Sequence, residues 1–439
     1  MLREHRLSTL SVPFRARLSG ASQTLALCLI LFGLPAIVQA QVTTDTTRLA
    51  QRPAAAAIPL AEMVNYAIVN YPAIAIARSA RNVAKFGIQQ ARSKHYPTVS
   101  VSGARRLDGD VTGSLGPRLN LNLYASGAIN AEIDREKWRE KSLASTEIER
   151  REDVAFEVVQ AYFRLVGAIR LRDTTQRSLD RHLDLVADFQ EIARLDRGRR
   201  FDLIQAQARA EQVRFQLAER KTEIALAIEG LARYYPLPFD AENLPAPTRL
   251  DDPNPINTAR QLSLANQHPT VLAAERQLFA ARANLRVARG NRGPRVDVES
   301  QTGGNRFSQL TLSWPAFDLA ASAAQDSADA ALIGAQAEVD EQRSIILETQ
   351  RVARASWRTA NEREAIATNQ IGIAESLVEV YREQFGIGRR NLLDLLNAYS
   401  ELANAEAAAV ISQTDAGLAR HQIEYAAGRL TLAFVSKVP

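Results

Sequence analysis

Two proline-free segments, residues 128–195 and 318–385, constrain the fold of this chain more than any other feature. Each is long enough for one uninterrupted helix of 68 residues, which would extend about 100 Å. Apolar residues in the first segment follow the alternating spacing of four and three that is typical of a coiled-coil seam: Ala155, Val159, Tyr162, Val166 and Ile169. The chain is therefore expected to form a rod of paired helices rather than a globular domain with a thick core.

Each long segment ends at a turn rich in glycine and arginine, and a shorter helical segment follows. The turns cover 197–200 and 386–390, and the returning helices are expected over 201–234 and 391–428. Because these helices have about half the length of the long ones, two of them stacked end to end would match one long helix. A run of alanines over 403–409 permits the close helix contact that such pairing requires.

The same order of landmarks occurs twice in the chain, at offsets between 191 and 197 residues. The matched landmarks are Tyr71-Pro72 with His268-Pro269, Tyr96-Pro97 with Gly293-Pro294, Val99 with Val296, Leu119 with Leu310, and Asp202 with Asp394. Ordered repetition of this kind indicates an internal structural repeat. We expect repeat 1 over 59–235 and repeat 2 over 257–430, with a proline-rich linker at 236–256 and a C-terminal tail at 431–439.

A β-hairpin is expected in each repeat, over 98–124 and 295–314, because apolar and polar residues alternate there with a period of two. Each hairpin follows a helical segment, which in repeat 1 covers 60–94 and ends before Pro97. Turn residues such as Gly109 stand between the strands. The predicted strands have about 7–10 residues, close to the roughly 9–11 that a tilted transmembrane strand needs.

Residues 1–40 are predicted to be a secretory signal peptide, followed by a flexible extension over 41–58. A basic start precedes an apolar run at 21–34, and Val38-Gln39-Ala40 supplies small residues for cleavage. The alternative is a transmembrane anchor, but the run is shorter than the roughly 20 residues that a membrane-spanning helix needs. Cys28 lies inside the run without a good lipobox around it. Any membrane insertion of the mature chain is therefore expected to use strands.

The composition argues against several classes of function. The 54 lysines and arginines exceed the 49 acids by five, and part of this excess lies in the leader, so no nucleic-acid footprint is predicted. One cysteine in the whole chain excludes disulfide scaffolds and cysteine-ligated zinc. The five histidines are scattered, and no catalytic or nucleotide-binding motif is present. We therefore predict no enzyme, no catalytic or metal site and no cofactor.

Four aromatic residues are expected at the helix-facing ends of the predicted strands: Tyr96, Tyr124, Trp314 and Phe317. This is one level, where the aromatic girdle of a membrane interface belongs. Four strands cannot close a barrel and their open edges are unfavourable in lipid, whereas three chains supply twelve strands. The alternative is a soluble four-stranded sheet that caps a coiled coil, as in a soluble periplasmic adaptor or scaffold protein.

The order of helix, hairpin, long helix, glycine turn and helix, repeated behind a signal peptide, resembles the TolC-type outer membrane efflux proteins, also called outer membrane factors. The sharpest local match is 388–398, in which Gly388 precedes Asp394 by six residues and Ala398 by ten, as in the periplasmic-tip motif of that family. The resemblance covers 59–430. The first tip departs from the motif, because Gly198 precedes Asp202 by only four residues.

This resemblance implies a mainly α fold with a membrane β-barrel part, in the outer membrane of a Gram-negative bacterium and extending into the periplasm. A homotrimer would combine a long α-helical coiled-coil barrel with a twelve-stranded barrel. Its implied function is a passive exit duct of a tripartite efflux or type I secretion system. The implied partners are outer membrane lipid, a periplasmic adaptor (membrane fusion) protein and an inner-membrane RND or ABC pump, which chooses the substrate.

The resemblance also implies a gate at the two tips. Asp394 would be a luminal acid, and Asn397 stands where some members have a second acid. Arg390 and Asp202 match positions that pair between neighbouring hairpins in the closed state, and Phe385 replaces a tyrosine of that lock. A threefold ring of Asp394 carboxylates would attract cations.

Glycines and arginines of the two turns complete the expected gate: Gly388, Gly198 and Arg389. The residues alone leave a simpler interpretation open. Asp202 and Asp394 stand in the first turn of a helix, where an acid interacts favourably with the helix dipole. The arginines would then be solvated tip residues.

Overall fold

The computed structural model describes residues 58–105, 113–245, 250, 258–302, 306–315 and 317–435. The predicted signal peptide and its extension lie outside the described residues, apart from Ile58. Most of the second half of the linker, the hairpin turn with Gly109 and the last residues of the tail also lie outside them.

Repeat 1 consists of helices that flank one hairpin, in the order α1 (Leu60–Asn70), α2 (Pro72–Ser93), β1 (Thr98–Arg105), β2 (Gly113–Tyr124), α3 (Ala128–Leu195), the single turn η1 (Arg197–Arg199) and α4 (Arg200–Ala232). Repeat 2 has the same order: α5 (Thr258–Asn266), α6 (Pro269–Asn291), β3 (Arg295–Gln301), β4 (Phe307–Ser313), α7 (Leu319–Gly386) and α8 (Leu392–Ala426), followed by α9 (Leu430–Val435). This arrangement confirms the predicted fold class with its internal repeat.

The short helices of each repeat are jointed at a proline. Pro72 and Pro269 occupy the first turn of α2 and α6, where a missing N–H costs nothing. The residues before them, Tyr71 and His268, are extended, with ψ of 132° and 136°. Among the described residues no single helix has the length and hydropathy to cross a bilayer, although α1 and α2, bent by 41°, pass that test as a pair by length and composition.

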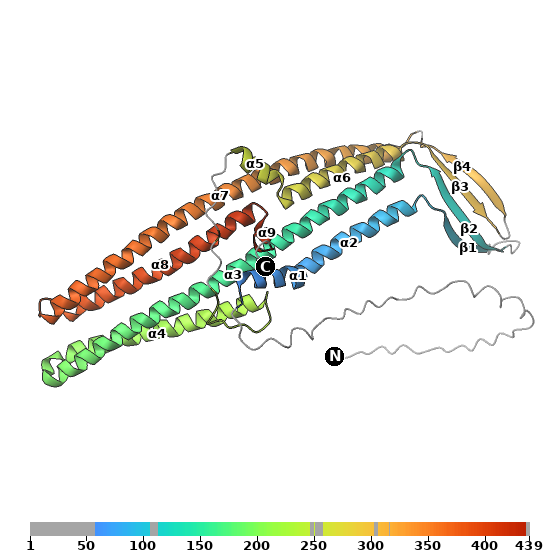
Figure 1. Cartoon of the computed structure of the whole chain (residues 1–439). Coiled ribbons are helices and arrows are strands. Elements are labelled where there is room, and N and C mark those ends of the chain that lie inside the picture. The colour runs from blue at the N-terminus through green and yellow to red at the C-terminus, as the bar shows by residue number, and fades with distance from the viewer. Residues whose placement is uncertain are drawn as a thin grey trace, which may run out of the picture. The chain divides into compact units, whose positions relative to one another are not determined.

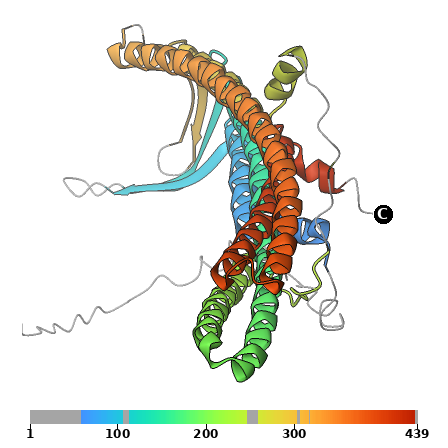
Figure 2. The same cartoon turned by 90° about the vertical axis from the view of Figure 1, so that its left-hand side faces the viewer.

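Pairs of short helices run along each long helix (Figure 1). In the half nearer the strands, α2 and α6 pack on α3, and α6 packs on α7. In the half nearer the tips, α4 and α8 pack on α3, and α8 packs on α7. The long helix α7 curves gently along its length (Figure 2), as long helices that wrap around a centre do.

The ends of the short helices meet closely at the waist between the two halves. At the junction of α4 and α2, Nε of Arg233 donates to the hydroxyl of Tyr71 over 2.9 Å, and the rings of Tyr71 and Tyr234 are 5.1 Å apart. At the junction of α8 and α6, Gly428 adopts a φ of +65°, and a Cβ there would lie 2.6 Å from Cδ of Pro269. This close approach and the left-handed backbone together require glycine.

The main hydrophobic core lies at the waist. It joins α1, the middle of α3, the end of α4 and α9, through residues such as Met63, Val158, Tyr162, Leu231 and Leu430. Elsewhere the contacts between α7 and α8 are small clusters of alanine, such as Ala360 with Ala416 and Ala419. The chain therefore has one thick core and otherwise the thin seams that its low aromatic content suits.

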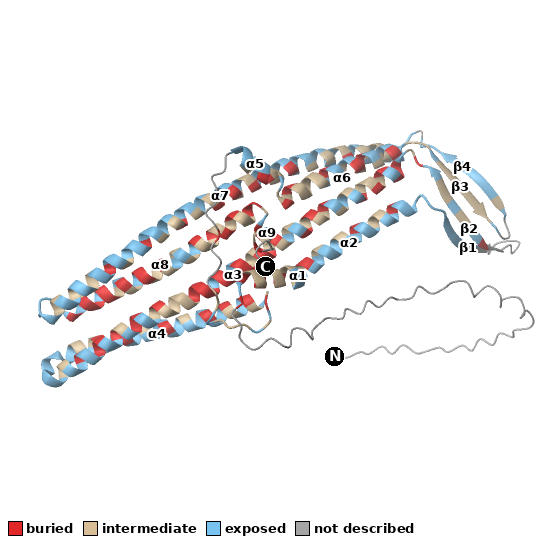
Figure 3. Cartoon of the chain, viewed as in Figure 1, coloured by how far each residue is buried: buried red, intermediate tan, exposed pale blue. Residues whose placement is uncertain are grey.

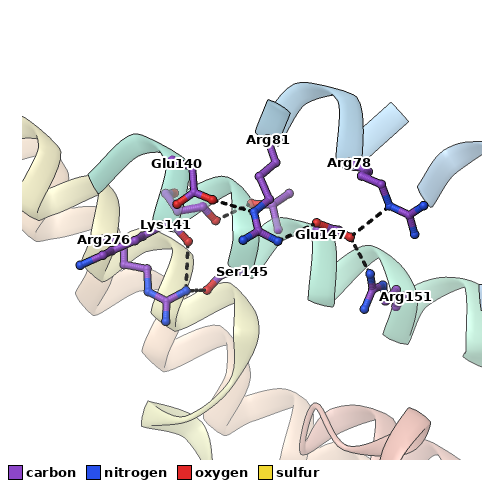
Figure 4. A network of polar contacts seen from close by, with 10 residues as sticks. Arg78, Arg81, Glu140, Lys141, Ser145, Glu147, Arg151 and Arg276 are labelled. Atoms are coloured by element: carbon purple, nitrogen blue, oxygen red, sulfur yellow. Dashed lines mark hydrogen bonds and ion pairs between the residues drawn. The ribbon is translucent and has the colours of Figure 1, made fainter. Parts of the chain in front are cut away.

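Ion pairs fasten α2 to α3 in the half nearer the strands (Figure 4). The nearly buried carboxylate of Glu147, on α3, lies within ion-pair distance of three guanidinium groups, from Arg78 and Arg81 of α2 and from Arg151 one turn along α3. Arg276 of α6 donates to the carbonyl of Lys141 over 3.0 Å and also contacts the Ser145 hydroxyl. These contacts fix the two short helices on opposite sides of α3.

The four strands form one antiparallel sheet in the order β1-β2-β3-β4. Apolar residues share one face, because Leu121 pairs with Val298 and Val298 with Leu310. Polar residues share the other face, where Asn122 donates to Asp297 over 2.8 Å. The apolar face is uncovered in the single chain (Figure 3), and Leu312, for example, is 69% exposed. A register shift between Asn122 and Tyr124 leaves Leu123 as a bulge.

Helix α9 occupies residues for which the sequence analysis expects only a tail. Glu152, on α3, accepts hydrogen bonds from the backbone N–H groups of Leu430 and Thr431 and from the Thr431 hydroxyl. Burial raises the pKa of Glu152, while these hydrogen bonds oppose the shift. Leu430 and Phe434 enter the main core. The tail is therefore anchored at the waist.

We predict that Glu152→Ala releases α9. The substitution leaves two backbone N–H groups at the waist without their acceptor, which is expected to lower the free energy of unfolding by about 1–3 kcal/mol. Thermal melting in detergent and trypsin cleavage after Arg429 measure the effect. Glu152→Gln keeps one oxygen acceptor and serves as the control. Equal cleavage rates for wild type and Glu152→Ala would contradict the anchor.

Candidate functional site at the helical tips

The tip of repeat 2 is a tight turn between α7 and α8. Gly388 ends α7 in the left-handed conformation, with a φ of +75°, and its N–H donates to the Phe385 carbonyl over 2.9 Å. The N–H of Arg389 donates to the Gln384 carbonyl over 2.9 Å. Asn391 then caps α8, because its side chain accepts from the N–H of Asp394 over 2.8 Å. Glycine at this position costs no steric strain, which explains the local motif.

Of the three charged gate residues predicted on this hairpin, Arg390 and Asp394 face each other, while Arg389 is exposed in the turn. Nη1 of Arg390 lies 3.7 Å from Oδ2 of Asp394, four residues on. Nε of Arg390 also donates to Gln384 over 3.1 Å, and its guanidinium lies 4.6 Å from the ring centre of Tyr381. The side chain of Arg390 thus lies against α7 and α8 of its own hairpin.

The tip of repeat 1 is built differently. Asp196 ends α3, and its carboxylate accepts from the N–H of Gly198 over 2.8 Å within the single turn η1. Gly198 stays out of the left-handed region, so its role differs from that of Gly388. Asp202, in the first turn of α4, pairs with Arg199 at 3.1 Å. The shorter spacing from Gly198 to Asp202 therefore corresponds to a turn of another shape.

The two tips lie side by side on a shared apolar cluster. Phe189 of α3, Ala206 of α4 and Leu396 of α8 are all buried in it. Phe385 is partly buried against the cluster, with its ring centre 5.6 Å from that of Phe189. Asn397 is exposed beside it. Phe385 thus packs within the chain, as a side chain without a hydroxyl can.

The structure brings some of the predicted gate residues together and leaves others apart. Arg390 pairs with Asp394, and Asp202 pairs with Arg199, each inside one hairpin. A link between Arg390 and Asp202 is not among the contacts of the described residues of one chain. That link is expected between neighbouring hairpins in the closed state, and it stays a prediction.

The four predicted girdle residues lie where the strands adjoin the helices: Tyr124 is the last residue of β2, and Tyr96, Trp314 and Phe317 stand in the connections. All four are exposed, from 53% for Tyr124 to 86% for Phe317. Nε1 of Trp314 donates to the Arg292 carbonyl over 3.2 Å, which fixes that indole at the end of the sheet. Large exposed aromatic side chains at one level are compatible with the predicted interface role.

An ion pair that the sequence analysis missed joins the two hairpins above the tips. Arg181 of α3 binds the nearly buried carboxylate of Glu406 of α8 through two hydrogen bonds, of 3.1 and 2.8 Å. Nδ1 of the neighbouring His182 lies 2.7 Å from the Ser178 carbonyl, and burial lowers the pKa of this imidazole. A single acid within the alanine run 403–409 was the available signal for this contact.

A cavity of about 450 Å³ lies between the same helices, further from the tips. Its lining comes from α3, α4 and α8 and includes Phe163, Leu171, Leu226, Ile411 and Thr414. The ion pair between Arg181 and Glu406 thus joins the two hairpins on the side of this cavity that lies nearer the tips. Within the described ranges, no group of three or more histidine, cysteine or acidic side chains is arranged to hold a metal ion.

Comparison with known proteins identifies the family. The family model for outer membrane efflux proteins matches residues 63–235 and 261–429, one match for each repeat, so the chain belongs to the outer membrane efflux protein family. This assignment confirms the resemblance found in the sequence and the expected location in the outer membrane.

Individual relatives are more distant. The chain is similar to Protein CyaE of Bordetella pertussis, with 28% identity over 259 residues that cover 55% of this chain and 53% of that protein. The chain thus spans about half the length of this curated relative.

Two solved structures share the fold. The outer membrane protein VceC of Vibrio cholerae has a TM-score of 0.71 at 17% identity, covering 84% of this chain and 96% of that one. The open state of the Neisseria gonorrhoeae outer membrane channel MtrE has a TM-score of 0.73 at 19% identity, covering 84% and 88%.

We predict that Arg181 and Glu406 are energetically coupled. Removing either partner, as in Arg181→Met or Glu406→Gln, leaves the other poorly solvated and is expected to lower stability by about 1–2 kcal/mol. The double variant should recover part of that loss, and denaturation of all four proteins gives the coupling energy. The exposed pair Arg220–Glu223 is the matched control, with an expected coupling below about 0.5 kcal/mol. Strict additivity at Arg181 and Glu406 would show that the contact is not formed.

Proposed function

We propose that the chain is one protomer of a homotrimeric outer membrane channel, a passive exit duct from periplasm to exterior in a tripartite efflux or type I secretion system. The observation that carries this proposal is the uncovered face of α7. Membership of the outer membrane efflux protein family supports the proposal.

Helix α7 is far less covered than α3, although both have 68 residues. Exposed apolar residues recur along α7 at steps of seven or fourteen: Ile345, Val352, Ile366, Ile373, Val380 and Ile387. Such a row is the seam of a coiled coil whose second helix does not come from the described residues of the same chain. Figure 3 shows how much of α7 is exposed compared with α3.

The opposite border of the helical layer carries matching residues. Ile76 and Val83 of α2, seven residues apart, are about 70% exposed. Phe201 and Phe215 of α4 are exposed as well. Because α7 packs on α6 and α8 while α2 and α4 pack on α3, the two uncovered rows lie at different borders. Copies joined border to border form a heterologous interface, which closes when the rotation generates a ring.

The sheet of a single chain likewise has unpaired edge strands and an uncovered apolar face. β1 and β4 are its edges, and its apolar face is exposed. Three copies joined through α7 would place four strands from each chain around one axis, and twelve strands close without a free edge. The apolar face would then meet lipid, and the exposed aromatic residues at the helix-facing ends would meet the headgroups.

At the other end, the six helix pairs of a trimer would converge on the tips. An adaptor protein and an inner-membrane pump are the proposed partners there, as the resemblance implies. We propose that Arg390 exchanges its contact with Asp394 for one with Asp202 of a neighbouring chain when the entrance closes. Both side chains are partly exposed at the tips, which permits this exchange.

The trimer is tested by Ile366→Asp. In a trimer this substitution places three carboxylates in buried seams, and each costs several kcal/mol without a partner. We expect monomers of unchanged helical content in detergent, measured by light scattering and circular dichroism. Thr368→Asp, two positions along α7 and also exposed, points to another side and is expected to leave the trimer intact. A stable trimer of Ile366→Asp would refute the proposed interface.

The gate is tested by Arg390→Ser in planar bilayers. Loss of the guanidinium is expected to weaken the closed entrance, so single-channel conductance should rise above that of the wild type. Arg363→Ser removes an equal charge from an exposed position of α7 away from the tips and is the control. Conductance equal to the wild type would remove Arg390 from the gate while leaving the channel itself in place.

A further inference from the structure

We infer that the periplasmic entrance attracts anions, because arginines outnumber acids at both tips. This inference rests on the proposed channel function. The nine residues 194–202 contain four arginines and two acids, and the nine residues 386–394 contain two arginines and one acid. Glu191, which pairs with Arg194, also lies at the first tip, so the net surplus at the two tips is two positive charges per chain.

The arginines are accessible at the tips. All six are exposed, whereas two of the three acids, Asp202 and Asp394, are only partly exposed and the third, Asp196, is exposed. The exposed arginines are Arg194, Arg197, Arg199, Arg200, Arg389 and Arg390. The positive charge therefore faces solvent more fully than the negative charge does.

The tip acids already have partners. Asp202 pairs with Arg199 at 3.1 Å, and Asp394 faces Arg390 at 3.7 Å. Asp196 accepts the N–H of Gly198. A carboxylate that shares a guanidinium contributes little to the field beyond the pair.

Three arginines have no carboxylate partner, and Asp196, which has no guanidinium partner among the described residues, offsets one of them. Of the other three, Arg194 pairs with Glu191 at 2.8 Å, Arg199 pairs with Asp202 and Arg390 faces Asp394. Within the part of the chain that the structure describes, no carboxylate stands within ion-pair distance of Arg197, Arg200 or Arg389. Threefold symmetry would place nine such guanidinium groups around one narrow mouth.

A ring of arginines favours anions in a pore, as a ring of carboxylates favours cations. The Debye length is about 8 Å at physiological ionic strength, so charges at the rim act on ions that enter a narrow mouth. The expected effect of Asp394 alone, attraction of cations, is thus outweighed by its neighbours. The class of solute that this entrance favours is small anions, including anionic cargo.

The test measures reversal potential across a planar bilayer with a KCl gradient, using the purified trimer without any partner protein. We expect chloride to permeate more readily than potassium in the wild type. The variant Arg197→Gln/Arg200→Gln/Arg389→Gln should lower the ratio of chloride to potassium permeability by about threefold or more. Because no adaptor protein is present, the selectivity that is measured comes from the trimer itself.

The control variant removes the same number of exposed arginines away from the tips, as Arg92→Gln/Arg177→Gln/Arg363→Gln. It should keep the wild-type reversal potential. A cation-selective wild type, or a tip variant with unchanged selectivity, overturns the inference and points to the arginines as a docking surface for an acidic partner. A complete lack of conductance would instead overturn the proposed channel, and this inference with it.

Discussion

The structure depends on one constraint: its helices form a layer that is only one helix thick. A helix in such a layer has neighbours on two sides, so no part of the chain surrounds it. Among the described residues, the largest cluster of buried apolar side chains lies at the waist, where α1, α3, α4 and α9 meet. The long row of exposed isoleucine and valine on α7 follows from this constraint, because no helix among the described residues covers it. Stability and assembly are therefore coupled.

The layer remains regular because short helices meet in pairs along each long one. Proline begins α2 and α6, and glycine at position 428 permits α8 to stop within contact of Pro269. The same local chemistry ends α7 at Gly388. Charged contacts then set how the helices lie against each other, as Glu147 does for α2 and Glu406 does for α8. Apolar seams built from alanine would specify the angle less well, since alanine side chains interlock little.

Local patterns in the sequence predict most of the fold. Period-two alternation predicts the strands, the absence of proline predicts the long helices, and the matched landmarks predict the repeat. Contacts between distant residues were not predictable, because Arg181 and Glu406 are 225 positions apart and neither belongs to a motif. Helix α9 was missed because six residues are too few for a periodic signal, and its position is fixed by Glu152, a tertiary contact. At the tips, the sequence places Asp202 and Asp394 after the turns but does not show that each has a partner in its own hairpin.

The anchoring of α9 has a consequence for how this chain matures. The core at the waist contains Ile58 and Leu60 from the beginning of the described chain and Leu430 and Phe434 from its end. The core is thus completed only when residues 430–434 have folded onto residues that precede them by more than 350 positions. A chain that stops early would retain its long helices but lack the contacts that close the waist. Incomplete chains would be left open to proteolysis before they could join an assembly.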